Sequence, residues 1–328
     1  MPRIQTVLNT HDHFGTVKAR TGIARTNYKV TPGLYCVGTP GLDSSVLVTA
    51  NYKLSFDALR KELTNLDVWI LVVDTRGINV WCAAGKGTFS TEEVTYQVKR
   101  TRLAELVSHR ELILPQLAAT GVASHLLKRQ CGFKGIFGPI LAAQISNFLK
   151  NNKQADESMR AVTFTLGERL VLVPVEICLL WKACLIVLLT IFILSGIGPD
   201  IYSLTAAWGR GKVAAMATLL AILAGALVSP LLLPWIPGRQ FWLKGLLVGA
   251  LTGLAAPLFS SGRTTSLEDM ALWVWVAVIA SYLAMNFTGA TPYTSLSGVE
   301  KEMRRGLPLQ VSGVLLAGLL WIGAPFAG

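Results

Sequence analysis

Five long apolar stretches fill the second half of this 328-residue chain. Each is close to the roughly 20 residues that an α-helix needs to cross a bilayer. The chain as a whole is 52% hydrophobic, and its mean hydropathy of +0.49 is too high for an ordinary soluble protein. Residues 171–328 are therefore predicted to form an all-α membrane domain of about five transmembrane helices. These stretches are Cys178–Ile197, Val213–Ile236, Phe241–Phe259, Met270–Thr288 and Leu309–Phe326.

Small residues in the third stretch predict how it packs. Gly245, Gly249 and Gly253 form a tandem GxxxG pattern. Glycines four residues apart lie on one face of a helix and allow a neighbouring backbone to approach closely. We therefore expect this helix to pack tightly against another one.

The charge is divided unevenly between the two halves of the chain. Residues 1–170 hold 21 Lys or Arg against 13 Asp or Glu, and residues 171–328 hold 9 against 6. No Lys/Arg run or aromatic-basic platform accompanies this excess, so the expected partner is membrane lipid and not nucleic acid. The predicted loops on one side of the membrane carry Arg239, with Lys244 nearby, and Lys301, Arg304 and Arg305. Those on the other side carry Arg210, Lys212 and Arg263.

This modest bias predicts a multi-pass protein of the cytoplasmic (inner) membrane, with its first half in the cytoplasm. The N-terminal residues contain no short apolar run of the signal-peptide kind, which agrees with that orientation. The five cysteines lack CxxC spacing, so neither a disulfide framework nor a zinc site is expected. Cys36, Cys131, Cys178 and Cys184 are interpreted as structural.

The first half of the chain alternates between short apolar runs and helical patterns. Apolar runs at 34–37, 45–50, 68–73, 111–114 and 133–137 predict strands. The helices between them are expected to begin after Ser55 and Ser90, and near Val122 and Leu141. Ser90 should cap the second of these helices, which is expected to run to about Ser108. Such alternation predicts a Rossmann-like α/β domain with a mostly parallel sheet covered on both faces.

We place this domain at residues 33–150, after an N-terminal extension at 1–32 and before a polar linker at 151–170. His11-Asp12-His13 in the extension has metal-binding residue types, but its position near the terminus favours a solvated or loosely packed lead.

Three loops are expected at the carboxyl ends of the strands, where parallel sheets bind ligands. They span 74–88, 115–121 and 138–139, and the longest contains Cys82. Asn79 is expected to cap a short helix that begins at Val80, which places Cys82 in its first turn. The exposed N–H groups there, with Arg76 and Lys86 nearby, favour the thiolate. One thiolate on a small helix suits an axial ligand to a metal held by a macrocycle, because a free ion needs several protein ligands.

Two other interpretations of this loop were weighed. A phosphate-binding loop requires Gly at position 80 and Ser or Thr at position 87, whereas the chain has Val80 and Gly87, so we exclude it. A nucleophilic cysteine with a histidine base stays open, although the spacing pairs neither His109 nor His125 with Cys82.

The segment Asn79-Val80-Trp81-Cys82-Ala83-Ala84-Gly85-Lys86 resembles the cap-helix motif of the mercury-methylating corrinoid protein family. Segments 46–51, 112–117 and 137–139 resemble other corrinoid-contacting segments of that family, and the large subunit of the corrinoid iron–sulfur protein shares related segments. The resemblance covers about residues 40–150, and the apolar half is similar to the membrane domain of the methylating family.

The resemblance implies a cobalamin-type corrinoid, its own lower base displaced, with Cys82 as the lower axial ligand of cobalt. Ala83 and Ala84 would give clearance beneath the ring. The implied cofactor-binding residues are Thr49, Asn51, Asn79, Val80, Trp81, Cys82, Ala83, Ala84, Gly85, Lys86, Pro115, Gln116, Gly121 and Gly138.

The function implied by the resemblance is that of a membrane-anchored, corrinoid-dependent methyltransferase. It would transfer a methyl group from cobalt to inorganic Hg(II) and form methylmercury. A thiolate ligand pushes electron density onto cobalt, which eases loss of the methyl group to a soft electrophile. The implied partners are a ferredoxin-like iron–sulfur electron donor, since this chain has no iron–sulfur cysteine cluster, and a folate-linked methyl donor protein; an oligomer is compatible with the sequence.

Two alternatives stay open. One is a corrinoid methyl carrier of the acetyl-CoA-pathway type; the missing cluster cysteines and the five apolar stretches argue against it. The other is a membrane transporter or receptor with a cytoplasmic sensing domain, which would need paired charges at mid-bilayer depth.

Overall fold

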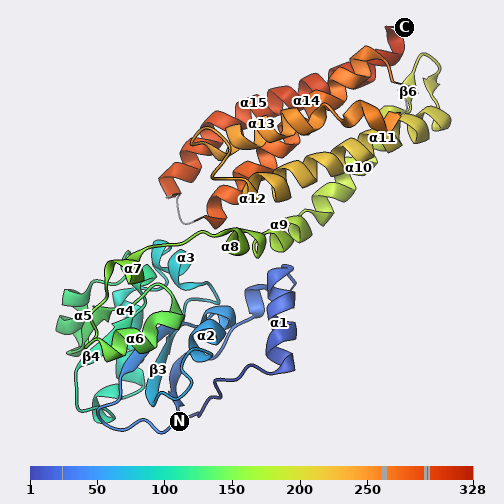
Figure 1. Ribbon diagram of the computed structural model, residues 1–328. Coiled ribbons are helices and arrows are strands. Elements are labelled where there is room, and N and C mark those ends of the chain that lie inside the picture. Colours follow the sequence, from blue (N-terminus) through green and yellow to red (C-terminus); the bar gives the residue numbers. More distant parts are fainter. Residues whose placement is uncertain (24, 261–263, 292–293, 295, 328) are drawn as a thin grey trace. The chain divides into compact units, whose positions relative to one another are not determined.

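The computed structural model describes residues 1–23, 25–260, 264–291, 294 and 296–327 (Figure 1). Arg263, which entered the charge argument above, lies outside the described residues. The chain divides into two compact units, Met1–Thr163 and Phe164–Gly328. The first is a mixed α/β unit and the second is helical apart from one small hairpin. Each is described by itself.

The α/β unit is built on a five-stranded sheet with the order β1-β3-β2-β4-β5. The edge strand β1 runs antiparallel to β3, and the other neighbours run parallel, so the predicted mostly parallel sheet is confirmed. The four strands that run parallel, β2 to β5, are mostly apolar because helices bury the sheet on both faces. The strands are β1 Gly33–Val37, β2 Val46–Ala50, β3 Val68–Val73, β4 Glu111–Leu114 and β5 Lys134–Phe137.

Helices cover both faces of the sheet because strand residues alternate between two apolar cores. One core joins Val48 and Leu71 of the sheet to Val94 and Leu127 of α4 and α5. The other joins the opposite face of the sheet to α2 and α6. The helical elements of this unit are α1 Thr10–Arg20, η1 Arg25–Asn27, α2 Lys53–Arg60, α3 Val80–Gly85, α4 Thr91–Arg100, η2 Leu103–Glu105, η3 Gln116–Ala118, α5 Ser124–Cys131, η4 Ala142–Gln144, α6 Ile145–Lys150 and α7 Glu157–Arg160.

Within the N-terminal extension Asp12 is packed and not solvated, whereas its neighbours His11 and His13 are exposed as predicted. Asp12 in α1 is only 5% exposed. Its carboxylate pairs with Lys53 Nζ and with the Arg60 guanidinium of α2, both at 2.6 Å. Burial by itself raises the pKa of Asp12, but hydrogen bonds from Lys53, from the backbone of Asn9 and from Arg60 outweigh burial and hold the pKa below its usual value.

Two predicted helices have different ends in the structure. Helix α2 begins at Lys53, before Ser55, and no side chain caps it. Helix α4 ends at Arg100 and not near Ser108. Ser90 caps α4 as expected by accepting from the Glu93 amide, but the Glu93 carboxylate accepts from the Asp74 amide at 2.8 Å. Glu93 therefore ties α4 to the end of β3.

The helical unit contains fewer full-length apolar helices than the five predicted. In the described residues three are long and apolar enough to cross a membrane, Leu204–Leu231, Ser266–Gly289 and Ser297–Phe326. A fourth is possible if Leu166–Leu179 and Trp181–Ser195, which meet at a 53° bend, form one span. The third predicted stretch forms the α-helix α13, Phe241–Gly253, about 20 Å long at 1.5 Å per residue, and then the separate 3-10 turn η6, Ala256–Ser260. Gly238, with φ +95°, precedes α13, and Pro257 follows it.

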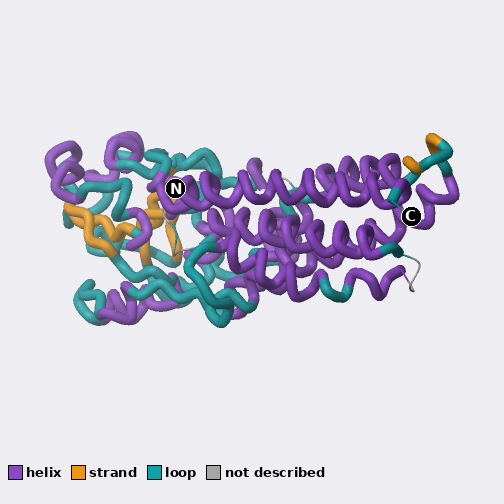
Figure 2. Tube along the Cα trace, turned by 90° about the horizontal axis from the view of Figure 1, so that it is seen from above, coloured by secondary structure: helices purple, strands orange, loops and turns teal. Residues whose placement is uncertain are grey.

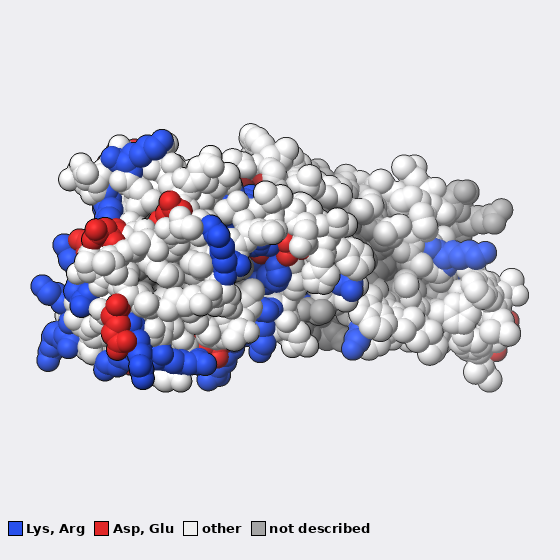
Figure 3. Space-filling model, turned by 90° about the horizontal axis from the view of Figure 1, so that it is seen from below, with Lys and Arg blue, Asp and Glu red and all other residues white. Residues whose placement is uncertain are grey.

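The helical unit consists mainly of long helices joined by short turns. In Figure 2 its helices run side by side as long purple tubes, and in Figure 3 charged side chains are dense over the α/β unit and sparse over the visible helical unit. The elements are α8 Leu166–Leu170, α9 Val173–Leu179, α10 Trp181–Ser195, β6 Ile197–Gly198, β7 Ile201–Tyr202, α11 Leu204–Ile222, η5 Leu223–Val228 (a π-helix), α12 Ser229–Leu231, α13 Phe241–Gly253, η6 Ala256–Ser260, α14 Ser266–Asn286, η7 Phe287–Ala290, α15 Leu296–Gly323 and η8 Ala324–Phe326.

The glycine face of α13 packs against α14, as the GxxxG pattern predicts. A Cβ on Gly245 would lie 2.4 Å from the Ala284 Cβ, and one on Gly249 would lie 2.7 Å from the Ala280 Cβ. Both distances are far below van der Waals contact, so only glycine allows this approach.

Arg210 was expected in a loop but lies within α11. Its guanidinium pairs with Glu268 of α14 at 2.6 Å and stacks over the Trp321 ring at 4.6 Å from the centroid. Lys301, Arg304 and Arg305 likewise belong to α15 and not to a loop. Helix ends therefore extend beyond the apolar stretches, because charged residues at helix ends are tolerated where they find partners.

Candidate functional site

A cavity of about 430 Å³ lies at the carboxyl ends of the central strands. From β2 the chain crosses to β3 on one side, and it later returns to β4 on the other side of β2. This reversal makes the β2/β4 boundary the topological switch point, where sheets of this type bind ligands. Thr49 near the end of β2 and Pro115 after β4 both line the cavity. The fold therefore forms a binding site where topology predicts one.

The helix that carries Cys82 forms one wall of this cavity. Asn79, Val80 and Trp81, at the start of α3, line it. The Asn79 side chain accepts a hydrogen bond from the Cys82 amide at 2.8 Å, which confirms the predicted cap. Cys82 is a free, partly exposed cysteine. The cap thus fixes the backbone of Cys82 directly beside the cavity-lining turn.

The back of α3 is packed into the protein. Ala83 and Ala84 are 0% and 4% exposed and belong to the core between the sheet and α4 and α5. A Cβ on Gly121 would lie 2.2 Å from the Phe89 carbonyl oxygen and 3.0 Å from the Ala84 Cα. The clearance predicted for Ala83 and Ala84 therefore serves helix packing: small residues let α3 approach the loop that contains Gly121.

Asn51 holds the loop that leads into α3. It is only 2% exposed and does not line the cavity. Its side-chain oxygen accepts from the amides of Thr75 and Gly77, at 3.1 and 2.9 Å. Its side-chain nitrogen donates to Asp74 at 2.8 Å. The side-chain amide of Asn51 therefore bonds to other residues of the protein, whereas the sequence predicted that it would contact the cofactor.

One buried amide oxygen next to the cavity has no protein partner. Gln116 Oε1 is buried and makes no hydrogen bond within the described part of the chain. Its neighbours Pro115 and Leu117 line the cavity. A buried acceptor without a donor is costly to a protein, and Gln116 itself does not line the cavity.

The predicted site residues fall into four groups. Cavity-lining positions are Thr49, Asn79, Val80, Trp81, Pro115 and Gly138. Supporting positions behind the wall are Asn51, Ala83, Ala84 and Gly121. The exposed end of α3 holds Gly85 and Lys86, while Cys82 and Gln116 lie beside the wall.

Sequence reasoning missed the lining that comes from the other face of the sheet. Ser55, Ala58 and Leu59 of α2 line the cavity, as do Ile140, Leu141, Ala142 and Ile145. The sequence could have predicted the contribution of α2, because the helix that follows β2 starts at the carboxyl edge of the sheet, where the site lies. No such indication exists for the segment after Pro139, since its course depends on packing against α2.

One of the two histidines weighed as a possible base, His109, has both ring nitrogens engaged elsewhere. The Nδ1 atom of His109 accepts from the Glu111 amide at 3.2 Å, and its Nε2 atom lies 2.9 Å from the Ser44 carbonyl oxygen. Among the described residues, no group of three His, Cys, Asp or Glu side chains can hold a metal ion. A Cys82–His109 nucleophile pair therefore gains no support.

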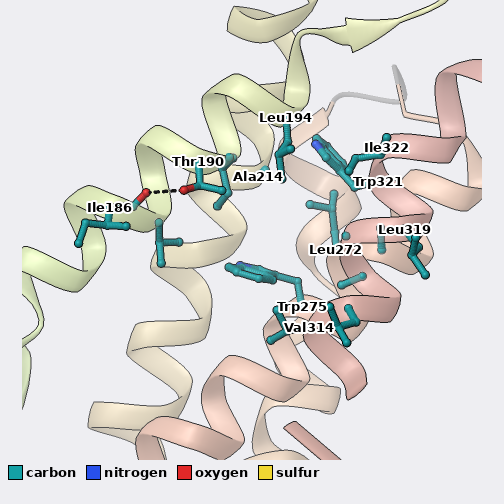
Figure 4. A pocket seen from close by; sticks show the side chains of 16 residues that line it. Ile186, Thr190, Leu194, Ala214, Leu272, Trp275, Val314, Leu319, Trp321 and Ile322 are labelled. Carbon is teal, nitrogen blue, oxygen red and sulfur yellow. Dashed lines mark hydrogen bonds between the residues drawn. The ribbon is translucent and has the colours of Figure 1, made fainter. Parts of the chain in front are cut away.

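A second cavity, of about 460 Å³, lies among α10, α11, α14 and α15 of the helical unit (Figure 4). Its wall is almost entirely apolar. The Thr190 hydroxyl donates to the Ile186 carbonyl oxygen at 2.9 Å, and the Trp275 indole donates to Thr218 at 2.9 Å. Because these polar groups are satisfied within the protein, the cavity has no evident chemical role.

Comparison with known proteins concerns the α/β unit. Residues 12–149 match the family model described as the CO dehydrogenase/acetyl-CoA synthase delta subunit. The acetyl-CoA decarbonylase/synthase complex subunit gamma of Archaeoglobus fulgidus is 32% identical over 130 residues, which are 39% of this chain and 27% of that protein. The same subunit of Methanocaldococcus jannaschii is 34% identical over 125 residues, 38% of this chain and 25% of that protein.

The chain thus spans about a quarter of the length of these relatives. The α/β unit is similar to subunits of acetyl-CoA decarbonylase/synthase complexes. These matches agree better with the acetyl-CoA-pathway alternative than with the mercury chemistry expected from the cap-helix resemblance.

Proposed function

We propose that the α/β unit is a corrinoid-binding methyl carrier of the kind found in the acetyl-CoA pathway. The observation that carries this proposal is the lone cysteine Cys82, on an Asn79-capped helix that walls the cavity at the β2/β4 switch point. The similarity of residues 12–149 to an acetyl-CoA synthase subunit supports it.

The residues present fit a corrinoid. A macrocycle supplies the equatorial ligands of its cobalt, so the protein needs to add only one donor, and the described residues offer no larger metal-binding group. The mostly apolar wall suits the ring faces.

In this mechanism the chain holds and orients the cofactor. When bound, the corrinoid supplies a cobalt centre that accepts and gives up a methyl group. Cys82 would provide a sulfur ligand to the cofactor, and Asn79 would keep the Cys82 amide engaged so that the first turn of α3 does not fray. Thr49, Pro115 and Gly138 would line the ring and exclude water.

We further propose inorganic Hg(II) as the methyl acceptor. The support is the resemblance of Asn79–Lys86 to the cap-helix motif of the mercury-methylating family and the presence of a large apolar helical unit in the same chain. On this proposal the helical unit anchors the protein in the cytoplasmic membrane, a ferredoxin-like protein supplies electrons and a folate-linked protein supplies the methyl group.

The cofactor proposal is tested on the detergent-solubilised full chain. The protein is incubated with cobalamin, desalted, and measured by visible absorption and cobalt content. We expect bound cobalt with a spectrum that changes in Cys82→Ala but not in the matched Cys36→Ala, whose thiol lies in the edge strand β1. An identical spectrum in Cys82→Ala would remove the thiolate ligand from the proposal.

The acceptor is tested separately. Protein loaded with an isotopically labelled methyl group is offered Hg(II) or, in a parallel reaction, an acetyl-CoA synthase with CO and coenzyme A. Labelled methylmercury that is absent with Cys82→Ala supports the mercury proposal. Label that enters acetyl-CoA alone would make the chain a methyl carrier of the acetyl-CoA pathway and would reject Hg(II) as the acceptor.

A further inference from the structure

Asn51 occupies a central point behind the cavity wall. Its backbone amide donates to the Val73 carbonyl oxygen at 3.0 Å, and its carbonyl oxygen accepts from the Val30 amide at 2.9 Å. The residue is therefore tied on one side to the end of β3 and on the other to the N-terminal segment. Because it is almost fully buried, its side chain has one fixed setting.

That side chain organises the turn between β3 and α3. The oxygen accepts from the Thr75 and Gly77 amides, and the Thr75 hydroxyl lies 2.9 Å from the same oxygen. The nitrogen donates to Asp74 Oδ1, which also accepts from the Arg76 amide at 2.9 Å. One amide group thus bonds, directly or through Asp74, to every residue of the Asp74–Gly77 turn.

The turn needs this support because it is strained. Arg76 and Gly77 both have left-handed backbone conformations, with φ of 59° and 77°. Glycine adopts this conformation freely, but for arginine it is costly and persists only where surrounding contacts hold it. Without the bonds from Asn51 and Asp74, we expect Arg76 to relax to a negative φ and the turn to change direction.

The direction of the turn decides where Cys82 lies. The Thr75 hydroxyl is 2.6 Å from the Ile78 carbonyl oxygen, within hydrogen-bond distance, and its single proton can be directed there or to Asn51. Asn79 follows Ile78 and caps the helix through the Cys82 amide. Contacts therefore run without a gap from Asn51, through the turn, to the backbone of Cys82.

We propose that Asn51 is a positioning residue that sets the place of Cys82 for ligation of the corrinoid. The structure requires asparagine here, because the position needs an acceptor toward Thr75 and Gly77 and a donor toward Asp74. Aspartate would place a second carboxylate against Asp74, and alanine would leave the turn amides without an acceptor. The inference rests on the proposed corrinoid function, but its effect on the loop exists without a cofactor.

The first measurement needs no cofactor. Hydrogen–deuterium exchange on the full chain in detergent compares Asn51→Ala with the wild type and with Asn147→Ala, a matched control on exposed α6 surface. We expect protection of the amides in segment 74–82 to fall by about tenfold or more in Asn51→Ala. Strand β3 should keep its protection, and Asn147→Ala should match the wild type.

The second measurement uses cobalamin. We expect Asn51→Ala to retain bound cobalt but to lose the Cys82-dependent spectral feature. Asn51→Asp should lose it too, and adding Asp74→Asn should restore a substantial part by removing the carboxylate repulsion. A general loss of stability would lower bound cobalt and would not be rescued by the second substitution.

The outcomes separate the two proposals. A wild-type protein without a Cys82-dependent spectrum rejects the corrinoid proposal, whatever the exchange results show. A wild-type spectrum that persists unchanged in Asn51→Ala and Asn51→Asp rejects the positioning role. If Asn51→Ala loses protection in β3 as well, the Asn51→Asp and Asp74→Asn pair decides, and failure of the rescue counts against the proposal.

Discussion

Replacing Gly121 by alanine probes the closest contact behind the candidate site. The added Cβ would lie 2.2 Å from the Phe89 carbonyl oxygen and 3.0 Å from the Ala84 Cα. A non-bonded carbon–oxygen contact is free of repulsion at about 3.3 Å, so either the new Cβ or the Phe89 carbonyl must move by roughly 1 Å. Both obstacles are backbone atoms, which cannot swing aside as the end of a side chain can. Gly121 does not have a left-handed φ, so the substitution tests space alone.

We expect Gly121→Ala to destabilise the α/β unit by about 2–3 kcal/mol, the upper part of the range for overpacked sites. The strain should appear in α3, because Ala84 belongs to that helix. Urea-dependent hydrogen exchange on the solubilised full chain gives both the free energy of unfolding and the local protection of residues 83–89.

The matched control is Gly41→Ala, since a Cβ there has no neighbour within 4 Å. It should change the stability by less than about 0.5 kcal/mol. If Gly121→Ala proves as stable as Gly41→Ala and exchanges like the wild type in α3, the close contact does not constrain the helix and the reasoning fails.

Three further substitutions test other parts of the structure. Asn79→Ala should lower the free energy of unfolding by about 0.5–2 kcal/mol, because it removes the α3 cap, and it should speed hydrogen exchange of the first-turn amides. Asn79→Asp keeps an acceptor and should exchange like the wild type. Equal exchange in the two variants would contradict the capping role. Because the pKa of Asp12 is lowered on folding, its contribution is present above the unfolded value of about 4 and is lost as the pH falls below it. The urea midpoint of the wild type should therefore drop more steeply with acidification than that of Asp12→Asn, and parallel curves would reject the buried ion pairs as the cause. Gly249→Ala should lower the melting temperature of the helical unit, because its Cβ would lie 2.7 Å from the Ala280 Cβ. Gly318→Ala is the control, because a Cβ there has no neighbour within 4 Å. Equal melting temperatures of the two variants would contradict close α13–α14 packing.

Sequence analysis was most successful for features set by near neighbours in the chain. The run Val68–Val73 formed β3 with the predicted bounds, and Glu111–Leu114 formed β4. Asn79 capped α3 because a cap joins residues three positions apart. The spacing of Gly245 and Gly249 likewise produced the close helix face.

Features that depend on distant segments were harder to predict. Asn51 was expected at the cofactor, but its partners lie 23 to 26 residues further along the chain. The Asp12 carboxylate is paired with Arg60, 48 residues away, which a terminal position did not suggest. The apolar stretch beginning at Phe241 became a 13-residue helix, since hydropathy alone does not indicate where a helix ends.

The sequence by itself determined the alternation of strands and helices, the two-part division of polarity, and the capped helix that carries Cys82. Periodicity, capping and hydropathy are local properties, and the backbone obeys them almost wherever it lies. Only the tertiary structure decided which side of α3 faces the cavity and which side, with Ala83 and Ala84, enters the core. It also assigned Asn51 to the turn and not to the cavity, because a buried amide must bond to whatever groups the fold brings beside it.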